Sequence, residues 1–411
     1  MRRTPTHHRP LHHARTTTPL TVIGGGFAGL TAAITAAEAG AKVTVYEAHH
    51  TLGGRARTAE GPYRTNEGPH ALYSGGPHWT WLTQRNLIAP LAPLPPLEAA
   101  RLRLHHRGAL RRTPPFGMLR LLRPRRTGQR APIDADFLTW ATEQAGEEAA
   151  RAAAHYAAVA LYHHDPGSLS AAFVQERLRR ATKLPPEAHY PRGGWASVVD
   201  RMAARAWNLG VRMEALSRVD SLDTDGRAHG PVIVATSLPR RPPPVEGRLA
   251  DLAERPTALV DLAVRTRRGD AFAVSDLDAP GWIERFTAQD RTLAPVGEQL
   301  IQGQFPIGPQ ESRADGVTRA ERLLDLAFPG WRDRVTWQHE ATASGRTGAV
   351  DPPGTSWRDR PAVDRGDGVY LAGDQVAAPG VLSEVSFNSA LAAVSLALGR
   401  RPKDTLDLKH A

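Results

Sequence analysis

The sequence predicts an α/β protein with a parallel β-sheet and a second unit of mixed α and β structure. Between residues 19 and 47, an apolar stretch, a glycine-rich turn, an alanine-rich stretch and a second apolar stretch follow one another. This order is typical of a β-α-β unit with parallel strands. Another strand pattern followed by a helix pattern lies at residues 368–398. The 37 glycines and 34 prolines indicate many turns and exclude a coiled coil.

Length and composition limit the class of protein further. The 411 residues are enough for two or three domains, and the 41% of hydrophobic residues can fill their cores. No stretch approaches the ~18 apolar residues of a membrane-spanning helix. Cysteine is absent, which excludes disulfides, cysteine-zinc sites and thiol nucleophiles. Because the first apolar stretch after Arg2-Arg3 begins only at Leu20 and contains three glycines, we expect a cytoplasmic protein rather than an exported one.

The net charge of +10 does not by itself predict a nucleic-acid partner. The basic residues are 48 arginines and only four lysines, a bias that fits GC-rich coding, and no basic helix or aromatic stacking platform accompanies them. Residues 99–133 hold ten arginines and no acidic residue. They could rest on an anionic membrane surface, but a solvated hairpin and helix is the favoured interpretation. The histidines of residues 1–18 lack carboxylate partners at ligand spacing, so we predict no metal site; the oligomeric state is left open.

The elements are predicted in order from hydrophobic periodicity and turn residues. The first unit consists of a strand at 20–23, a helix at 27–39 closed by Gly40, and a strand at 42–47. The middle of the chain predicts helices within 134–181 with a break at 163–167, a helix at 195–209, and strands at 211–219 and 232–235 around a turn at 223–226. After a proline-rich segment at 239–244, we expect short strands up to 340 with a helix at 319–327, a strand at 368–371 and a helix at 383–398.

A glycine motif between the first strand and the first helix predicts a dinucleotide site. The motif is G-x-G-x-x-G, formed by Gly24, Gly26 and Gly29. Its first glycine permits the tight turn, its second lets a pyrophosphate touch the backbone, and its third lets helix and strand pack closely. Phe27 and Ala28 stand at the start of the helix, where unpaired amides attract phosphate.

The residues after the second strand narrow down the dinucleotide. Glu47 ends that strand, where its carboxylate could accept hydrogen bonds from an adenosine ribose and would repel the 2′-phosphate of NADP. Gly53, Gly54 and Arg55 follow in the context EAHHTLGGRART. This segment resembles the flavin-containing amine oxidase superfamily, which includes phytoene desaturases and protoporphyrinogen oxidase. The resemblance implies that FAD is the cofactor and that these three residues contact its diphosphate and ribityl chain. Two glycines allow close approach, and arginine offers bidentate donors to phosphate.

A second segment, Asn66–His70, resembles the part of the family that runs beside the isoalloxazine ring. The resemblance implies that Gly68 and Pro69 contact FAD there. His70 is a weak candidate for a catalytic residue because imidazole changes its charge near neutral pH. An ordinary loop histidine is the equal alternative.

Further segments resemble the remaining FAD motifs of the family, so that the matches extend from about residue 19 to 400. Residues 368–374 (GVYLAGD) resemble the late motif, which implies that Gly373 and Asp374 meet the ribityl chain or the diphosphate. Val381 precedes the last helix, whose N-terminus is implied to face the flavin pyrimidine edge. Val219 is implied to border the adenine. The segment Tyr190–Gly194 matches another recurrent pattern of the family.

The chain departs from the amine oxidases of this family in its lysines. None lies between residues 184 and 402, whereas amine oxidases usually keep a lysine there that reaches flavin N5 through water. Amine oxidation of that type is therefore in doubt, and the desaturase-like branch fits better. The resemblance implies an enzyme that transfers a hydride from a small or apolar organic substrate to flavin N5, with reoxidation by dioxygen or another acceptor. A redox-neutral flavin-dependent isomerase and, less favoured, an NAD-dependent dehydrogenase are the alternatives.

These observations together predict two domains. A Rossmann-like FAD-binding domain would consist of residues 19–88, 190–256 and 355–400. A substrate domain made of residues 89–189 and 257–354 would be inserted between these parts. Residues 1–18 and 401–411 are expected to be tails. The substrate is expected to be a small molecule, and no group of residues identifies it.

Overall fold

The predicted β-α-β unit opens the fold. The computed structural model describes residues 18–68, 71–89, 91, 94–122, 130–183, 186–220, 230–236, 256–345 and 348–399. Strand β1 (Pro19–Ile23) leads into helix α1 (Phe27–Glu38) and strand β2 (Lys42–Tyr46). The two strands are parallel, with Pro19 opposite Lys42 and Ile23 opposite Tyr46. The unit therefore matches the sequence prediction within a residue or two at each boundary.

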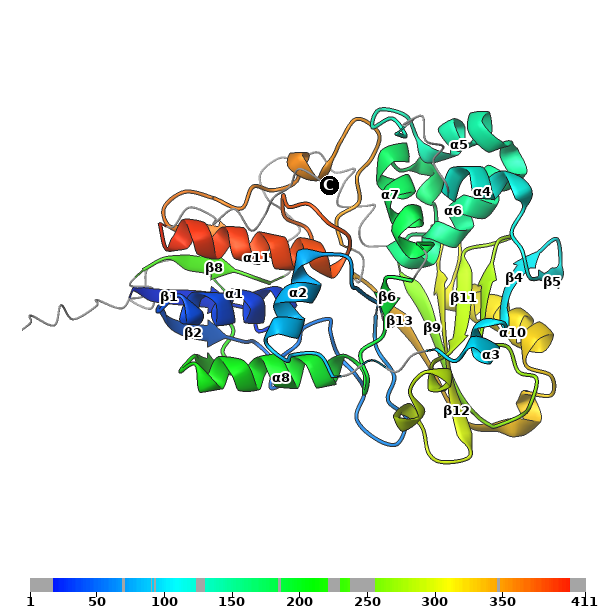
Figure 1. Cartoon of the computed structure of the whole chain (residues 1–411), viewed down its shortest axis with the longest axis horizontal. Helices are drawn as coiled ribbons and strands as arrows, with labels where there is room; N and C mark the ends of the chain where they lie inside the picture. Colours follow the sequence, from blue (N-terminus) through cyan, green and yellow to red (C-terminus); the bar gives the residue numbers. More distant parts are fainter. Residues whose placement is uncertain are drawn as a thin grey trace, which may run out of the picture.

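A parallel five-stranded sheet grows around this unit from remote parts of the chain (Figure 1). Its strand order is β14-β8-β1-β2-β7, and all four neighbouring pairs are parallel. The added strands are β7 (Arg212–Glu214), β8 (Val232–Val234) and β14 (Val369–Leu371). Strand β7 is shorter than the predicted 211–219, while the turn at 223–226 and the segment 239–244 lie outside the described residues. Because all strands run the same way, their carboxyl ends meet at one edge.

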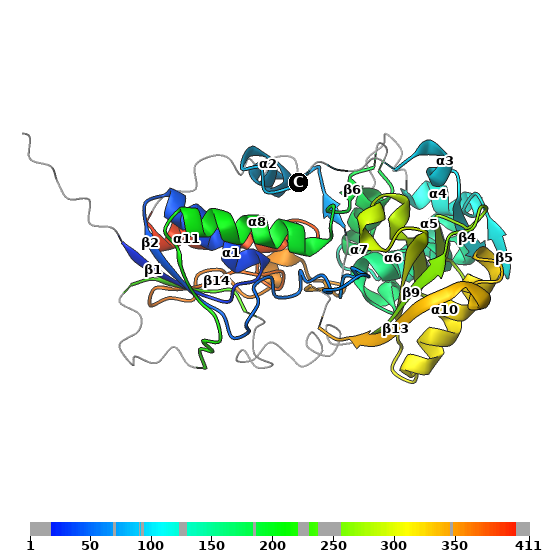
Figure 2. The ribbon, with the colours of Figure 1, turned by 90° about the horizontal axis from the view of Figure 1, so that it is seen from below.

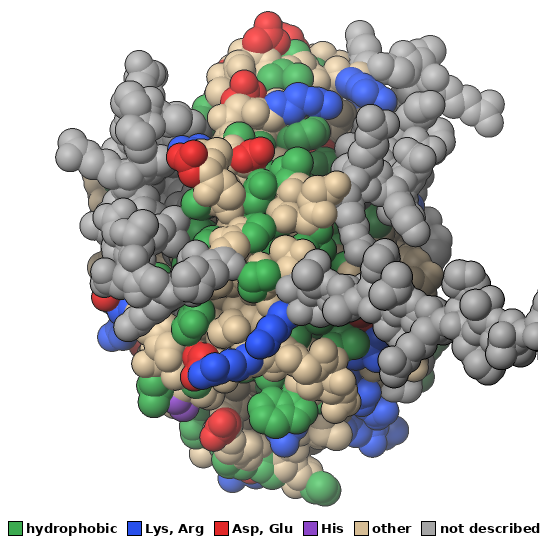
Figure 3. All heavy atoms as spheres, turned by 90° about the vertical axis from the view of Figure 1, so that its left-hand side faces the viewer, with side chains coloured by type: hydrophobic (Ala, Val, Ile, Leu, Met, Phe, Trp, Pro, Cys, Tyr) green, Lys and Arg blue, Asp and Glu red, His purple; other side chains and the backbone are tan. Residues whose placement is uncertain are grey.

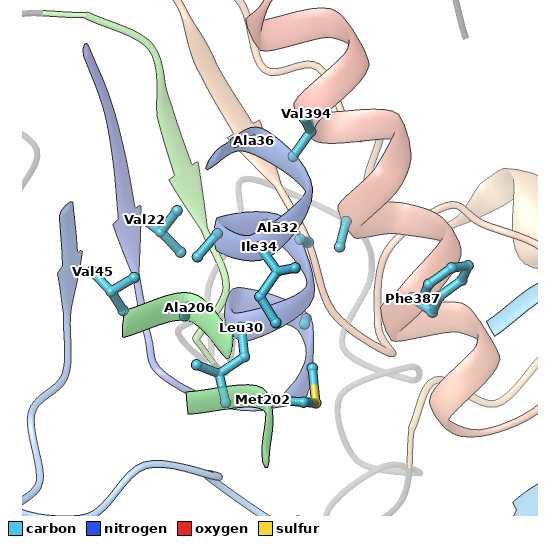
Figure 4. Packing of buried hydrophobic residues seen from close by; sticks show 14 of the residues in the cluster. Val22, Leu30, Ala32, Ile34, Ala36, Val45, Met202, Ala206, Phe387 and Val394 are labelled. Atoms are coloured by element: carbon cyan, nitrogen blue, oxygen red, sulfur yellow. The ribbon is translucent and has the colours of Figure 1, made fainter. Parts of the chain in front are cut away.

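Three helices pack next to one another beside this sheet. Helix α1 lies between α11 (Ser383–Ala397) and α8 (Trp195–Asn208), and α8 runs alongside α1 in Figure 2. Leu30 and Ile34 of α1 are fully buried, as are most of the alanines of this helix. A helix that is apolar on all sides must be covered on all sides, and Figure 4 shows side chains of the sheet, α8 and α11 around it. The alanine-rich sequence thus explains the central position of α1.

A seven-stranded sheet forms the second part of the molecule. Its order is β13-β9-β12-β11-β10-β4-β5, and every pair is antiparallel except β10 with β4. The strands are β4 (Leu102–His106), β5 (Ala109–Arg111), β9 (Thr257–Arg265), β10 (Ala273–Asp276), β11 (Gly281–Arg285), β12 (Glu298–Pro306) and β13 (Val335–Ala343). The sequence predicted only short strands up to residue 340, and this was wrong, because β9, β12 and β13 have nine residues each. The alternation along them is weak because β9 and β12 are buried on both faces.

Helices cover both faces of the seven-stranded sheet. Helix α10 (Arg313–Ala327) packs on one face, and it begins six residues earlier than predicted because Ser312 and Asp315 form a capping box. Helix α6 (Glu147–Leu161) contacts β10, β11 and β12. The neighbours of α6 are α4 (Phe116–Leu122), α5 (Phe137–Ala145) and α7 (Ala171–Ala181). The break between α5 and α6 falls at Gly146, which has a φ of +84° and was not predicted.

Small elements complete the described chain. Helix α2 (Pro77–Gln84) contacts α11, and the short helix α3 (Pro96–Ala99) precedes β4. Strands β3 (Leu72–Tyr73) and β6 (Ala188–His189) pair antiparallel. Among the described residues, no helix is both long and apolar enough to cross a membrane. Where described atoms are visible in Figure 3, acidic and basic side chains are interspersed on that end of the molecule.

Candidate functional site

A cavity of about 760 Å³ lies at the carboxyl ends of β1, β2, β8 and β14. This is the edge at which doubly wound sheets bind ligands, and the volume is within the usual range of ligand pockets. Eleven of the predicted cofactor-binding residues line the cavity. They are Gly24, Gly26, Phe27, Ala28, Glu47, Gly53, Gly54, Arg55, Val219, Gly373 and Asp374.

Two glycines of the motif are required by the packing of the chain itself. Gly24 has a φ of +104°, and a Cβ atom there would lie 2.7 Å from the carbonyl oxygen of Ala235, just after β8. A Cβ atom at Gly29 would lie only 1.8 Å from the carbonyl oxygen of Gly24. Gly29 does not line the cavity; it lets α1 approach the turn closely. The structure therefore gives these two residues the turn and packing roles predicted from the motif.

Gly26 differs from both, because nothing in the described part of the chain excludes a side chain there. Its φ of −75° suits any residue, and the nearest atom to a Cβ would be the Cα atom of Gly54, 3.8 Å away. Gly26 is also the N-cap of α1 and offers no side-chain acceptor to the first-turn amides, and no acidic residue stands in that turn. A ligand with negative charge that touches the backbone would account for both features.

Glu47 connects the glycine-rich turn to the end of β2. Its side chain is 6% exposed, and its two oxygens accept hydrogen bonds from the backbone amides of Gly25 at 2.7 Å and His49 at 2.9 Å. Each carboxylate oxygen keeps a second lone pair for another donor. The residue is thus held in a fixed position on the wall of the cavity and can still accept hydrogen bonds from a hydroxyl group.

Arg55 and Asp374 form an ion pair across 319 residues of sequence. The negative charge of Asp374 raises the pKa of the Arg55 guanidinium. Arg55 follows Gly53 and Gly54, both of which have positive φ values, and Asp374 follows the end of β14. The two segments predicted to bind one cofactor, from opposite ends of the chain, are therefore in direct contact.

The N-terminus of α11 forms another part of the wall. Leu382, Ser383 and Ser386 line the cavity, and Leu382 has a strained φ of +53°. Among the described residues, neither the buried Ser383 hydroxyl oxygen nor the buried Nε atom of Arg57 on the same wall has a hydrogen-bond partner. Buried polar atoms normally have partners, so both atoms indicate a polar ligand in this cavity.

The remaining predicted residues are placed differently. Gly68 and Val381 are buried but do not line the cavity, although Leu382, the neighbour of Val381, does. Pro69 and His70 lie outside the described residues, so their roles stay predictions. Sequence reasoning missed several wall residues, which include Arg57, Trp195, Ser217, Arg218, Gln375, Ser383 and Ser386. Two of them had a sequence signal: Trp195 directly follows the Tyr190–Gly194 segment, and Ser383 begins the last predicted helix.

The comparisons with known proteins concern the fold. Residues 22–88 match the family model described as an NAD(P)-binding Rossmann-like domain. No curated protein matches the sequence. The solved structures that share the fold over almost the whole chain include the following three.

An oxidoreductase from Methanosarcina mazei is 17% identical, with a TM-score of 0.69, and the match covers 92% of this chain and 100% of that one. A cyclohexylamine oxidase from Brevibacterium oxydans is 17% identical, with a TM-score of 0.64 and coverages of 96% and 100%. A reduced UDP-galactopyranose mutase is 15% identical, with a TM-score of 0.63 and coverages of 95% and 97%. The chain therefore shares the fold of these three structures, and its α/β, Rossmann-like architecture agrees with the sequence prediction.

Proposed function

We propose that the protein is an FAD-dependent oxidoreductase that removes a hydride from a small organic substrate. The observation that carries this proposal is the single cavity that joins the glycine motif, the Gly53-Gly54-Arg55 segment and the Gly373-Asp374 segment. A nucleotide that contacted only the glycine motif and the Gly53-Gly54-Arg55 segment would leave the Gly373-Asp374 segment without a role. The alternative of an NAD-dependent dehydrogenase is less favoured for the same reason.

The residues of the cavity fit FAD in chemical type. Glu47 would hold the adenosine ribose, and the first turn of α1, with Gly26 as its cap, would receive the diphosphate. Arg55 would add a fixed positive charge, kept in position by Asp374. The N-terminus of α11 would stabilise negative charge on the flavin. When bound, FAD supplies hydride and electron transfer that no amino-acid side chain can perform.

The division of the chain into an FAD-binding domain and a substrate domain is part of this proposal. The described five-stranded sheet would hold the cofactor, and the seven-stranded sheet would hold the substrate. The fold likeness to a cyclohexylamine oxidase and to a UDP-galactopyranose mutase supports neither reaction specifically, because one fold serves many functions. The electron acceptor is proposed to be dioxygen or another oxidant.

Anaerobic reduction of the purified FAD complex tests the proposal. Small amines, alcohols and apolar alkenes are added in turn while the absorbance of oxidised flavin is followed. We expect one class to bleach the flavin and dioxygen to restore the colour. Conversion of a substrate to an isomer without any electron acceptor would contradict the oxidoreductase proposal and favour the redox-neutral isomerase. Protein that binds no FAD would contradict both.

A further inference from the structure

Histidine and aspartate side chains meet where strands β4 and β10 end. The two strands are parallel, and His105 of β4 lies opposite Asp276 of β10. Asp278 follows two residues after the end of β10 and contacts the turn between β4 and β5. Its carboxylate accepts hydrogen bonds there from the backbone amides of Arg107 at 3.0 Å and Gly108 at 3.1 Å. The two aspartates are therefore held in fixed positions beside the histidine.

These three side chains present their polar atoms to one another. The Nδ1 atom of His105 lies 2.8 Å from Oδ1 of Asp276 and 3.7 Å from Oδ2 of Asp278. Among the described residues, this is the one group of three or more histidine, aspartate or glutamate side chains whose ligand atoms all lie within 4.8 Å of one another. Two ligands of an ion bound at about 2.0–2.2 Å are separated by about 3–4 Å. The spacing of the group therefore fits one bound metal ion.

The group is buried on one side and reaches solvent on the other. The side chains of His105 and Asp276 are 3% and 2% exposed, whereas that of Asp278 is 33% exposed. An ion can therefore enter from solvent. The hydrogen bonds of Asp276 all end on its Oδ1 atom, so Oδ2 is available as a further ligand atom. Two neighbouring carboxylates, one of them buried, hold negative charge that a bound cation would balance.

The next residue of β4, His106, adds a nitrogen atom without a partner. Its Nε2 atom lies 2.8 Å from Oε1 of Glu148, in the first turn of α6. A carboxylate only accepts hydrogen bonds, so in a neutral ring Nε2 carries the proton and Nδ1 carries the lone pair. This Nδ1 atom is buried and makes no hydrogen bond with the described residues, although Oδ1 of Asp278 is only 3.2 Å away.

The lone pair of His106 is independent evidence for a cation. A nitrogen lone pair beside a carboxylate oxygen is repelled unless positive charge lies close to both atoms. A proton on Nδ1 does not supply this charge well, because the two atoms lack the alignment of a hydrogen bond. Histidines that bind metal ions usually donate their other ring N–H to a carboxylate or carbonyl group. The contact between His106 and Glu148 is such an arrangement.

The types of donor atom select the kind of ion. Imidazole nitrogen together with carboxylate oxygen suits Zn²⁺ and related transition-metal ions, whereas Ca²⁺ and Mg²⁺ are bound mainly by oxygen. The guanidinium group of Arg107 does not replace such an ion, because it is paired with Glu148 at 2.7 Å rather than with an aspartate of the group.

We propose that the two histidines and the two aspartates bind one Zn²⁺ ion, with Asp278 between the histidines. Binding exchanges the proton that His105 and Asp276 share for the ion. Four protein ligands form a closed, structural site, which would hold the ends of β4 and β10 together. None of these residues lines the cofactor cavity, so the site goes beyond the proposed oxidation. Sequence spacing does not reveal it, because 171 positions separate His105 from Asp276.

Titration calorimetry with ZnCl₂ tests the proposal. The histidines near the N-terminus can also bind zinc, so the full chain is titrated in a background in which these four are replaced by glutamine: His7, His8, His12 and His13. We expect one ion per chain, with a dissociation constant below about 1 μM. Asp278→Asn should weaken binding at least about 100-fold, and His105→Gln at least about tenfold. Circular dichroism shows whether each variant is folded, and His105→Gln decides if Asp278→Asn does not fold.

His339→Gln is the matched control for this titration. The Nδ1 atom of His339 lies 3.6 Å from Oδ2 of Asp261, but this pair belongs to no group of three ligands among the described residues. Its replacement should leave the zinc affinity unchanged. A background protein that binds no zinc, or a folded Asp278→Asn or His105→Gln variant with unchanged affinity, would overturn the proposal. None of these results depends on FAD, so failure here is distinguishable from failure of the proposed function.

Discussion

The cofactor cavity differs in construction from a polar row on the seven-stranded sheet. This row consists of Glu284, Gln302, Asp261 and His339, which lie opposite one another on neighbouring strands. The cavity is formed mainly by backbone: turns with positive φ at Gly24, Gly53 and Gly54, helix N-termini, and a carboxylate held by two amides. The polar row consists of side chains from four strands that only strand pairing brings together. A backbone site requires particular residues at fixed spacing, whereas a side-chain row requires only register. The first can therefore be recognised in a sequence and the second cannot.

The acidic side chains of the two sites also have different surroundings. In the cavity, Glu47 accepts hydrogen bonds from two backbone amides and Asp374 is paired with Arg55, so both carboxylates are held in position. In the row, Glu284 is kept neutral by burial. The cavity is thus suited to hold one ligand firmly.

Gly29→Ala, in the glycine-rich turn, is the substitution with the largest expected effect on stability. Because the new Cβ atom would lie 1.8 Å from the carbonyl oxygen of Gly24, α1 must shift, and we expect a loss of about 3 kcal/mol in the free energy of unfolding. Urea unfolding measures this loss. Gly40→Ala is the control, since nothing lies within 4 Å of its Cβ position and only its positive φ costs about 1–2 kcal/mol. Equal losses in both variants would contradict the packing role of Gly29.

Gly26→Ala separates ligand binding from folding. The chain itself leaves room for this methyl group, so the free energy of unfolding without FAD should change by about 1 kcal/mol or less. The affinity for FAD should fall about 100-fold, or about 3 kcal/mol, because the methyl group stands where the diphosphate would touch the backbone. Titration calorimetry gives both dissociation constants. Wild-type affinity in this variant would place the diphosphate elsewhere.

The dependence of stability on pH distinguishes the polar row from the cavity. The pKa of Glu284 is about 8 in the folded protein and has an ordinary value of 4.5, so between these values the folded state binds one more proton than the unfolded state. This contribution is fully present below about pH 4.5 and is lost as the pH rises to about 8, at about 1 kcal/mol per pH unit. Glu284→Gln should therefore show a flatter decline in urea unfolding over this range. Parallel profiles would show that Glu284 is already ionised.

A smaller effect is expected from Arg55→Lys. Lysine keeps the charge beside Asp374 but loses the two-pronged geometry of the guanidinium, so the affinity for FAD should weaken about tenfold. Arg85→Lys is the control, because Arg85 pairs with Glu38 in a similar partly exposed way and does not line the cavity. Fluorescence quenching of FAD measures both variants. A loss of affinity in the control of the same size would remove the specific role of Arg55.

The sequence was informative where local backbone geometry depends on residue type. Gly24 and Gly29 predict the tight turn, and the alanines of α1 predict a helix that is buried on all sides. The nine-residue strands of the second sheet were missed because β9 and β12 are buried on both faces and lack alternation. The break at Gly146 was missed because a single glycine also occurs inside helices. Glu284 carried no signal, since its meaning depends on Tyr190 and Gln302, which are remote in sequence.

Equilibrium binding of FAD to the wild-type protein tests the central claim most directly. Protein freed of any flavin is titrated with FAD, and the stoichiometry, the dissociation constant and the shift in melting temperature are measured together. We predict one FAD per chain, a melting temperature that rises with FAD concentration, and no comparable effect of NADP. A protein that stays colourless, with an unchanged melting temperature at saturating FAD, would contradict the account.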